Sequence, residues 1–166
     1  EPARPLVTPG EIMLAKVWSM ALVVLLAATL SLNGVVRGLM QVPVEGSVAL
    51  FVLTTALHLF ATTSMGIFMA TLARSMPQFG MLLMLTLLPL QMLSGGMTPR
   101  ESMPGVVQAL MLAAPTTHFV AASQAVLYRA AGLSIVWPQL LALAAIGAVF
   151  FSVSLRRFRN TLSRMA

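Results

Sequence analysis

The chain has 166 residues, a formal net charge of +6, 58% hydrophobic side chains and 8% charged ones. A mean hydropathy of +0.93 leaves too little polar surface to solvate a soluble domain of this length, so the composition excludes an ordinary soluble protein. The arginines stand almost singly at the ends of apolar runs, which indicates topology signals, and we expect no nucleic acid partner.

Four long stretches of the sequence contain no charged side chain. Each is long enough to cross a hydrocarbon layer about 30 Å thick as a helix. We expect membrane spans at approximately residues 17–36, 48–73, 78–96 and 134–155, an outer hairpin at 103–130 and a cytoplasmic basic tail at 156–166. The predicted fold class is therefore all-α: a polytopic transmembrane helical bundle of four spans plus a re-entrant outer helical hairpin, in one domain over residues 1–166.

The entry to the first span carries a capping signal. Thr8, Pro9 and Glu11 have the spacing of a capping box with proline at the first helical position, and Val7 and Ile12 can form a hydrophobic staple. A helix is therefore predicted to start at the membrane surface and to run to about residues 33–34. The chain opens on Glu1 without a signal-peptide pattern, so we expect a piece of a longer protein.

Polar and small residues share one face of the second span. Thr55, His58, Thr62 and Gly66 recur at steps of three and four residues. Helix packing is the favoured interpretation of this face, because hydroxyls and small residues let backbones approach closely, and a solute path is the alternative. The thirteen methionines also have two interpretations. They face lipid, which we favour, or they form an adaptable surface for hydrophobic solutes.

An uncharged window at residues 102–128 is long enough to cross, but prolines and polar residues interrupt it. These are Pro104, Pro115, Thr116, Thr117 and His118. An open helix break facing lipid would leave backbone groups unpaired, so we predict two short helices, near residues 106–114 and 119–129, that dip in from the outer face. The alternative is a fifth span.

Lysine and arginine at the span ends set the orientation, because positive residues are retained in the cytoplasm. Four spans with both termini inside place most positive residues there: Arg4, Lys16, Arg74, Arg156, Arg157, Arg159 and Arg164, against Arg37, Arg100 and Arg129 outside. A topology with five spans divides these positive residues more evenly between the two sides of the membrane, so their distribution favours four spans.

No catalytic or metal-binding constellation is found in the sequence. The chain has no Asp and no Cys, and His58 and His118 are too isolated to make a metal site, so we expect no enzyme activity, no metal and no cofactor. Carriers driven by ion gradients usually hold a charged coupling group within the bilayer. Here only His58 could titrate at depth, so energy for uphill transport is expected to enter from a cytoplasmic ATPase.

Three segments carry a resemblance to a known family. They read PLVTP at residues 5–9, SGGMTP at 94–99 and PTTHF at 115–119. In this order the chain resembles the permease subunits of type-2 ABC exporters, most closely the bacterial inner-membrane drug-efflux branch, over nearly its whole length.

The resemblance implies a six-span permease of which this chain is the last four spans. It implies a cytoplasmic ABC ATPase subunit, a second permease copy as homo- or heterodimer, membrane lipid around the spans and room for a periplasmic adaptor protein. The ATPase contact maps onto Leu6, Val7, Thr8, Pro9 and Glu11, although Pro2 and Pro5 depart from the helical approach usual in the family. The outer hairpin would cap the exit path.

The expected function is export of a hydrophobic or drug-like solute from the cytoplasm across a bacterial inner membrane. Two alternatives remain open. One is a gradient-driven carrier or channel that uses His58, and the other is a non-transporting membrane scaffold assembled through faces at Gly34 and Ala144.

Overall fold

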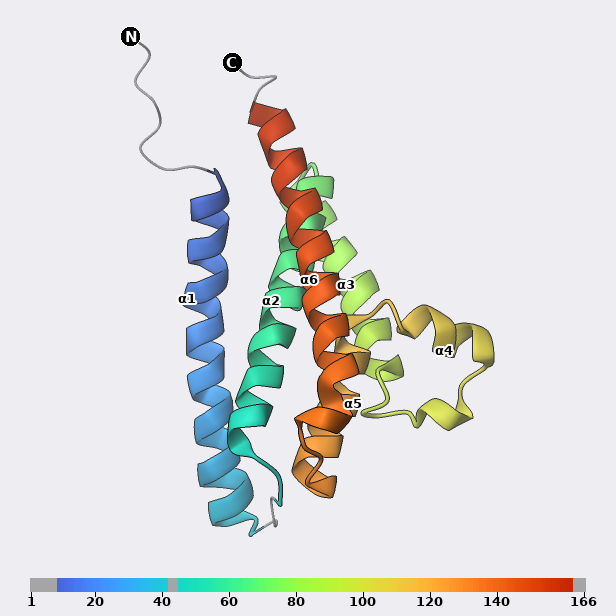
Figure 1. Cartoon of the computed structure of the whole chain (residues 1–166). Coiled ribbons are helices and arrows are strands. Elements are labelled where there is room, and N and C mark those ends of the chain that lie inside the picture. The colour runs from blue at the N-terminus through green and yellow to red at the C-terminus, as the bar shows by residue number, and fades with distance from the viewer. Residues whose placement is uncertain (1–8, 42–44, 163–166) are drawn as a thin grey trace.

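The structure, a computed structural model, describes residues 9–41 and 45–162. This part of the chain is all-helical, and Figure 1 shows its helices in chain order. The elements are α1 (Pro9–Leu30), the π-helix η1 (Ser31–Leu39), α2 (Val48–Leu72), α3 (Met76–Leu93), the short 3₁₀-helix η2 (Arg100–Ser102), α4 (Gly105–Met111), α5 (Pro115–Arg129) and α6 (Leu133–Leu162).

Four helical segments of the described chain are long and apolar enough to cross a membrane. They are Trp18–Leu39, Val48–Leu72, Met76–Leu93 and Leu133–Phe158. The shortest, α3, has 18 residues and is about 27 Å long at 1.5 Å per residue, close to the thickness of a hydrocarbon core. The predicted all-α membrane bundle of four spans is confirmed.

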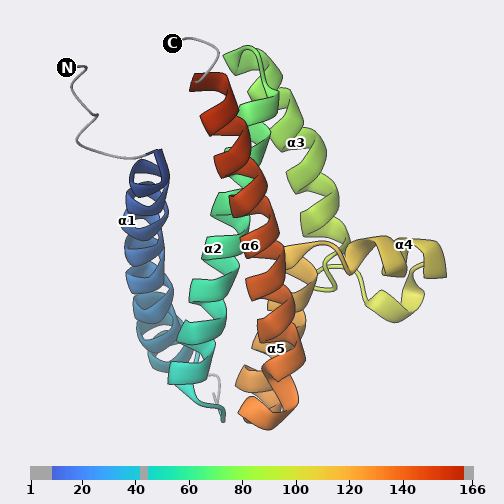
Figure 2. The same cartoon turned by 45° about the horizontal axis from the view of Figure 1, so that its top comes forward.

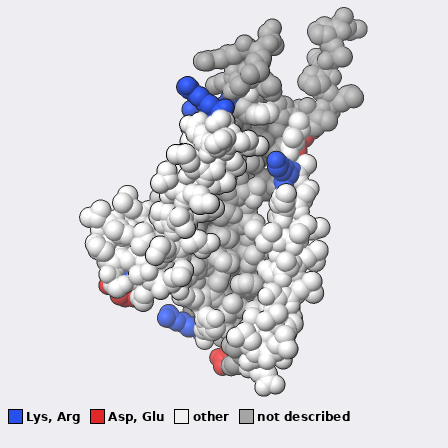
Figure 3. All heavy atoms as spheres, turned by 180° about the vertical axis from the view of Figure 1, so that it is seen from behind, with Lys and Arg blue, Asp and Glu red and all other residues white. Residues whose placement is uncertain are grey.

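The ends of these helices fall into two groups. The start of α1, the turn from α2 to α3 and the end of α6 lie together at one end of the bundle, here called the basic end (Figures 1 and 2). The end of η1, the start of α2, the end of α5 and the start of α6 lie at the opposite end, here called the hairpin end. On the face shown in Figure 3, charged atoms lie toward these two ends and uncharged atoms fill the band between them, as a membrane-crossing bundle requires.

The α2 helix is the centre of the bundle, with α1 on one side and α6 and α5 on the other. It packs most extensively against α6, and the two come closest at Gly147, where an added Cβ would lie 2.5 Å from Phe60 Cδ1 and 3.2 Å from the Ala61 Cα. Aromatic pairs follow the same seam toward the basic end: Phe60 with Phe151 and Phe68 with Phe150, at centroid distances of 6.0 and 5.5 Å. A glycine in the middle of α6 thus sets the depth of this packing.

Serine side chains cap the second and third spans. Ser47 accepts a hydrogen bond from the Leu50 amide at the start of α2, and Ser75 accepts one from the Gln78 amide at the start of α3. The Gln78 side chain in turn accepts from the Arg74 amide at 2.8 Å. This reciprocal arrangement satisfies donors that a helix start otherwise leaves orphaned, so the turn between α2 and α3 is short and fixed.

The hairpin end is held by an apolar cluster between α5 and α6. It consists of Ala122, Val126, Ala131, Val136 and Leu140. The chain before α2 joins this cluster, because the Glu45 amide donates to the Leu127 carbonyl at 3.4 Å and a Cβ on Gly46 would overlap the Val126 carbonyl oxygen. Only glycine allows so close an approach of two backbones at this point.

Two helices are peripheral. No residue of α3 is buried, and α1 has large exposed apolar side chains such as Trp18 and Leu30. Met81, Met84, Met92 and Met97 are exposed, whereas Met103 is buried beside α4. Met81, Met84 and Met92 lie on the spanning helix α3, which agrees with the lipid-facing interpretation for these three.

The helices extend beyond the apolar stretches that predicted them. The first helical segment runs from Pro9 through η1 to Leu39, past residues 33–34, and α6 continues through Arg156 and Arg157 to Leu162. Hydropathy marks the thickness of a membrane, but a helix continues into water as long as its residues favour it. The third span instead ends at Leu93, earlier than residue 96, where Gly95 adopts φ 95°.

The window at residues 102–128 forms the two short helices α4 and α5, bent by 91° at their junction. The α4 helix projects sideways from the bundle, and α5 runs along α2 and α6 toward the hairpin end (Figures 1 and 2). Both spans that flank the pair, α3 and α6, meet it on the side away from the basic end.

Candidate functional site

The polar face of α2 is partly buried in the bundle: Thr55 is buried, and His58, Thr62 and Gly66 are half-buried. Thr55 is buried and its hydroxyl donates to the Phe51 carbonyl at 2.8 Å, while the Thr62 hydroxyl donates to the His58 carbonyl at 2.8 Å. Both hydroxyls are thus bonded within their own helix. Gly66 is half-buried and an added Cβ would meet nothing within 4 Å, so no backbone packs closely there.

The imidazole of His58 has a partner on another element. It stacks on the Phe119 ring of α5, with centroids 4.3 Å apart and planes inclined by 16°. The stack joins the polar face of α2 to the second helix of the bent pair. Phe119 belongs to the polar run beginning at Pro115, but nothing in a single sequence indicates that it would meet His58.

Several buried polar atoms near this contact have no hydrogen-bond partner among the residues that the structure describes. They are His58 Nδ1, Thr117 Oγ1, Ser123 Oγ and Gln139 Oε1, with Ser64 Oγ farther along α2. All but Ser64 lie on the segments of α2, α5 and α6 that pack together at the hairpin-end half of the bundle. These atoms make the interior between α2, α5 and α6 partly polar.

The corner between α4 and α5 is built by the residues expected for an outer hairpin. Pro104 precedes α4, and Pro115 is the buried first residue of α5, where a missing amide costs nothing. Thr116 is half-buried and Thr117 is 1% exposed. The His118 Nε2–H donates to the Leu112 carbonyl at 2.7 Å, which ties the first turn of α5 back across the corner.

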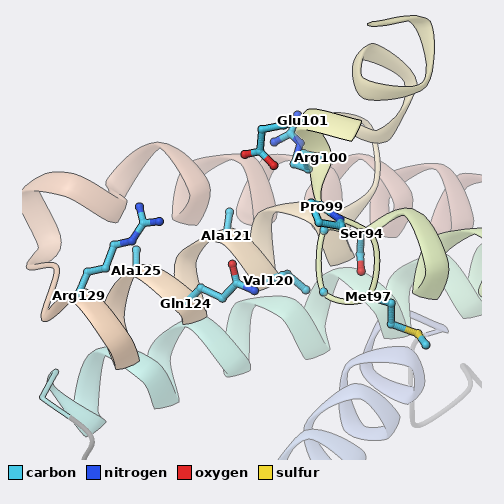
Figure 4. A pocket seen from close by; sticks show the side chains of 12 residues that line it. Ser94, Met97, Pro99, Arg100, Glu101, Val120, Ala121, Gln124, Ala125 and Arg129 are labelled. Carbon is cyan, nitrogen blue, oxygen red and sulfur yellow. The ribbon is translucent and has the colours of Figure 1, made fainter. Parts of the chain in front are cut away.

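A cavity of about 340 Å³ lies between the end of α3 and the exposed side of α5. Figure 4 shows its side chains: Arg100 and Glu101 from η2 on one side, Gln124 and Arg129 from α5 on the other, and Met97 at its edge. Gly95 has a φ of 95°, which glycine adopts readily and which lets the loop after α3 fold back. The Arg100 side chain lies over this glycine, because a Cβ there would be only 3.2 Å from Arg100 Cγ. Sequence analysis treated Arg100 and Arg129 only as topology signals and did not indicate this cavity.

The expected ATPase contact lies only partly within the described residues. Leu6, Val7 and Thr8 fall outside them, so the capping box and the staple are not described. Pro9 begins α1, and Glu11 in its first turn is exposed at the basic end. The Gly34 face is open, because a Cβ on Gly34 would meet nothing within 4 Å, and Ala144 is half-buried on α6 beside Leu143.

The described residues include no group of three or more His, Cys, Asp or Glu side chains that could hold a metal ion.

Comparison with known proteins gives the family. Residues 1–128 match the family model described as ABC-2 type transporter. The chain is 64% identical over 160 residues to "Inner membrane transport permease YhhJ" of Escherichia coli (strain K12), covering 96% of this chain and 43% of that relative. It is 30% identical over 120 residues to "Probable multidrug ABC transporter permease YbhR" of the same strain, covering 72% of this chain and 33% of that relative.

The chain therefore spans less than half the length of the curated relatives it matches. No solved structure is a significant match. The order of four candidate spans with a bent helix pair before the last agrees with the family match over most of the chain. The chain therefore belongs to the ABC-2 type transporter family.

Proposed function

We propose that this chain is the four-span part of a permease subunit of an ATP-driven exporter that moves a hydrophobic or drug-like solute out of the cytoplasm. The observation that carries the proposal is the family match over residues 1–128, supported by two relatives whose names describe transport permeases. The chain spans 43% of the relative that is 64% identical to it, so the activity of a whole permease is part of the proposal.

ATP hydrolysis is assigned to a separate nucleotide-binding subunit. All four carboxylates of the sequence are glutamates, at residues 1, 11, 45 and 101, and none falls within a candidate span. The candidate spans of this chain therefore offer no carboxylate for coupling to an ion gradient, which supports energy input from a partner. The start of α1, with Pro9 and Glu11, and the α2–α3 turn share the basic end, and we assign the ATPase contact to that end.

The proposed location is a bacterial inner membrane, with the basic end in the cytoplasm. Lys16, Arg74, Arg156 and Arg157 occupy the basic end, and positive residues near spans favour the cytoplasmic side. In this orientation α4 and α5 form a re-entrant hairpin on the outer side, where we place the exit of the path. The exposed faces of α1 and α3 leave room for a second permease copy and for the missing spans.

The polar face of α2 is proposed to pack rather than to conduct. Its hydroxyls donate to their own backbone, and His58 stacks on Phe119. This contact supports a structural role for His58 over the role of a titrating group in a carrier.

The test uses the full-length protein in cells loaded with a fluorescent hydrophobic dye. Efflux should continue when a protonophore collapses the ion gradient and should stop when ATP is depleted. The His58→Phe variant, which keeps an aromatic ring but cannot titrate, should export at nearly the wild-type rate. Efflux that survives ATP depletion but is lost with the gradient and in His58→Phe would establish a gradient-driven carrier instead.

A further inference from the structure

We propose that the cavity between the end of α3 and α5 binds the acidic headgroup of a membrane amphiphile, a phosphate group being the chemistry it recognises. The proposal does not depend on which solute the protein exports.

The charge of the cavity favours an anion. Arg100 and Arg129 line it from opposite sides, and Glu101 is the single carboxylate among its lining residues. Within residues 9–41 and 45–162, no ion pair joins any of these three side chains to a protein group. Two guanidinium groups against one carboxylate leave the cavity with an excess of positive charge, which an entering anion reduces. Guanidinium groups bind phosphate oxygens in a two-pronged geometry.

The cavity is built by the fold rather than being a chance gap between flexible side chains. The left-handed backbone at Gly95 turns the loop back, so that Arg100 lies over this glycine. The amide of Ser102 donates to the Pro99 carbonyl at 3.1 Å, and that of Met103 donates to the Arg100 carbonyl at 3.1 Å, which fixes η2. On the other side, Gln124 and Arg129 belong to one regular helix, α5, and the Gln124 side chain adds an amide donor.

The size and surroundings of the cavity suit a headgroup attached to apolar chains. A volume of about 340 Å³ lies at the low end of the range of roughly 300–1,000 Å³ seen for small-molecule sites, so a headgroup fits and a whole lipid does not. Met97 lines the cavity and is 78% exposed, and Met92 in the last turn of α3 is 56% exposed. Acyl chains can lie along these methionines while the headgroup occupies the polar interior.

The position along the bundle agrees with this assignment. The cavity follows the end of a span, where the chain leaves the apolar band, and Figure 3 shows charged atoms at this level of the molecule. Lipid phosphates lie at this depth, just outside the hydrocarbon core. The site therefore meets a phosphate without moving it into the apolar layer.

The experiment titrates purified full-length protein in neutral detergent with phosphatidylglycerol or with phosphatidylcholine of the same acyl chains, and measures bound lipid by native mass spectrometry. The wild type should bind phosphatidylglycerol more tightly. The Arg100→Gln/Arg129→Gln double variant should lose roughly tenfold in affinity for it and bind both lipids alike, as expected when charge-assisted contacts are removed. The matched control Arg37→Gln, which removes one positive charge at the same end outside the cavity, should bind as the wild type does.

Two further arms define the source of the anion and guard against misfolding. In one arm, inorganic phosphate is added to the wild type with bound phosphatidylglycerol. If phosphate displaces the lipid from the cavity but not lipid bound elsewhere on the protein, the cavity takes free phosphate as well as a lipid headgroup. The Arg100→Lys/Arg129→Lys variant keeps both charges and should retain the preference for phosphatidylglycerol. Unchanged affinity in the double Gln variant, or an equal loss in Arg37→Gln, would overturn the proposal.

Discussion

His58 of α2 and Phe119 of α5 are stacked face to face, with ring centroids 4.3 Å apart. This contact joins the central span to the bent helix pair at a level where several polar atoms are buried without partners. The position of α5 against the bundle therefore depends on an aromatic pair as well as on the apolar cluster nearer the hairpin end.

Removing either ring should loosen α5. We expect His58→Ala and Phe119→Ala each to lower the thermal unfolding midpoint of the full-length protein in detergent, and the double variant to show a coupling of about 0.5–1.5 kcal/mol, typical of aromatic pairs. His58→Phe should retain most of the stability. Additive losses in the double variant would mean that the two rings do not stabilise each other.

Gly147 should tolerate no side chain without a cost. Gly147→Ala places a methyl group 2.5 Å from Phe60 Cδ1, and overpacking of this kind typically costs about 1–3 kcal/mol. The matched control is Gly66→Ala on α2, where a Cβ has open space and should be neutral or stabilising by up to about 1 kcal/mol. Thermal unfolding measures both variants. If the Phe60 ring causes the clash, Phe60→Ala should remove most of the penalty of Gly147→Ala.

Gly46 should be needed to hold the chain before α2 against α5. In Gly46→Ala the new methyl group would overlap the Val126 carbonyl oxygen, so one of the two backbones must move. Hydrogen exchange should become faster at the Glu45 amide, which donates to the Leu127 carbonyl, and in the last turn of α5. Gly105→Ala, where a Cβ meets nothing within 4 Å, is the control. Equal exchange in the two variants would contradict the close contact.

Single cysteines can test the orientation directly, because these 166 residues contain none, and any cysteine elsewhere in the full-length protein is first replaced by serine. In intact cells, a membrane-impermeant maleimide should label Arg37→Cys and Arg129→Cys of the full-length protein. It should label Glu11→Cys and Arg156→Cys only after lysis. The reverse pattern would place the basic end outside.

The same labelling separates a re-entrant pair from a fifth span. Arg100 precedes α4 and Arg129 ends α5. If the pair is re-entrant, Arg100→Cys and Arg129→Cys react from the same side of the membrane. Reaction from opposite sides would mean that α4 and α5 together cross the bilayer.

Much of the fold could be predicted from the sequence, because spans are defined by composition. Uncharged runs that end at Arg37, Arg74 and Arg156 have few alternatives to a spanning helix, and the prolines at 104 and 115 divide the remaining window. The exact helix ends could not be predicted, since η1 and the last turns of α6 lie beyond the apolar runs. The π-helical form of η1 has no signal in the sequence that we can identify.

The candidate site could be predicted only in part. The spacing of Thr55, His58 and Thr62 indicates a shared helix face, but not that Phe119 covers His58. The scaffold alternative named Ala144 on the last span, whereas Gly147 three residues later makes the close contact with α2. Such pairings join residues far apart in the sequence, and a periodicity within one helix carries no information about its neighbours.

The short turn at residues 74–78 couples the movement of α2 to that of α3. Its reciprocal hydrogen bonds hold the two helix ends together, so a push on this turn at the basic end would tilt α3 rather than bend the connection. Over a helix about 27 Å long, a tilt of ten degrees displaces the far end by about 5 Å. That far end is one wall of the headgroup cavity, so the same small rotation would widen or close it.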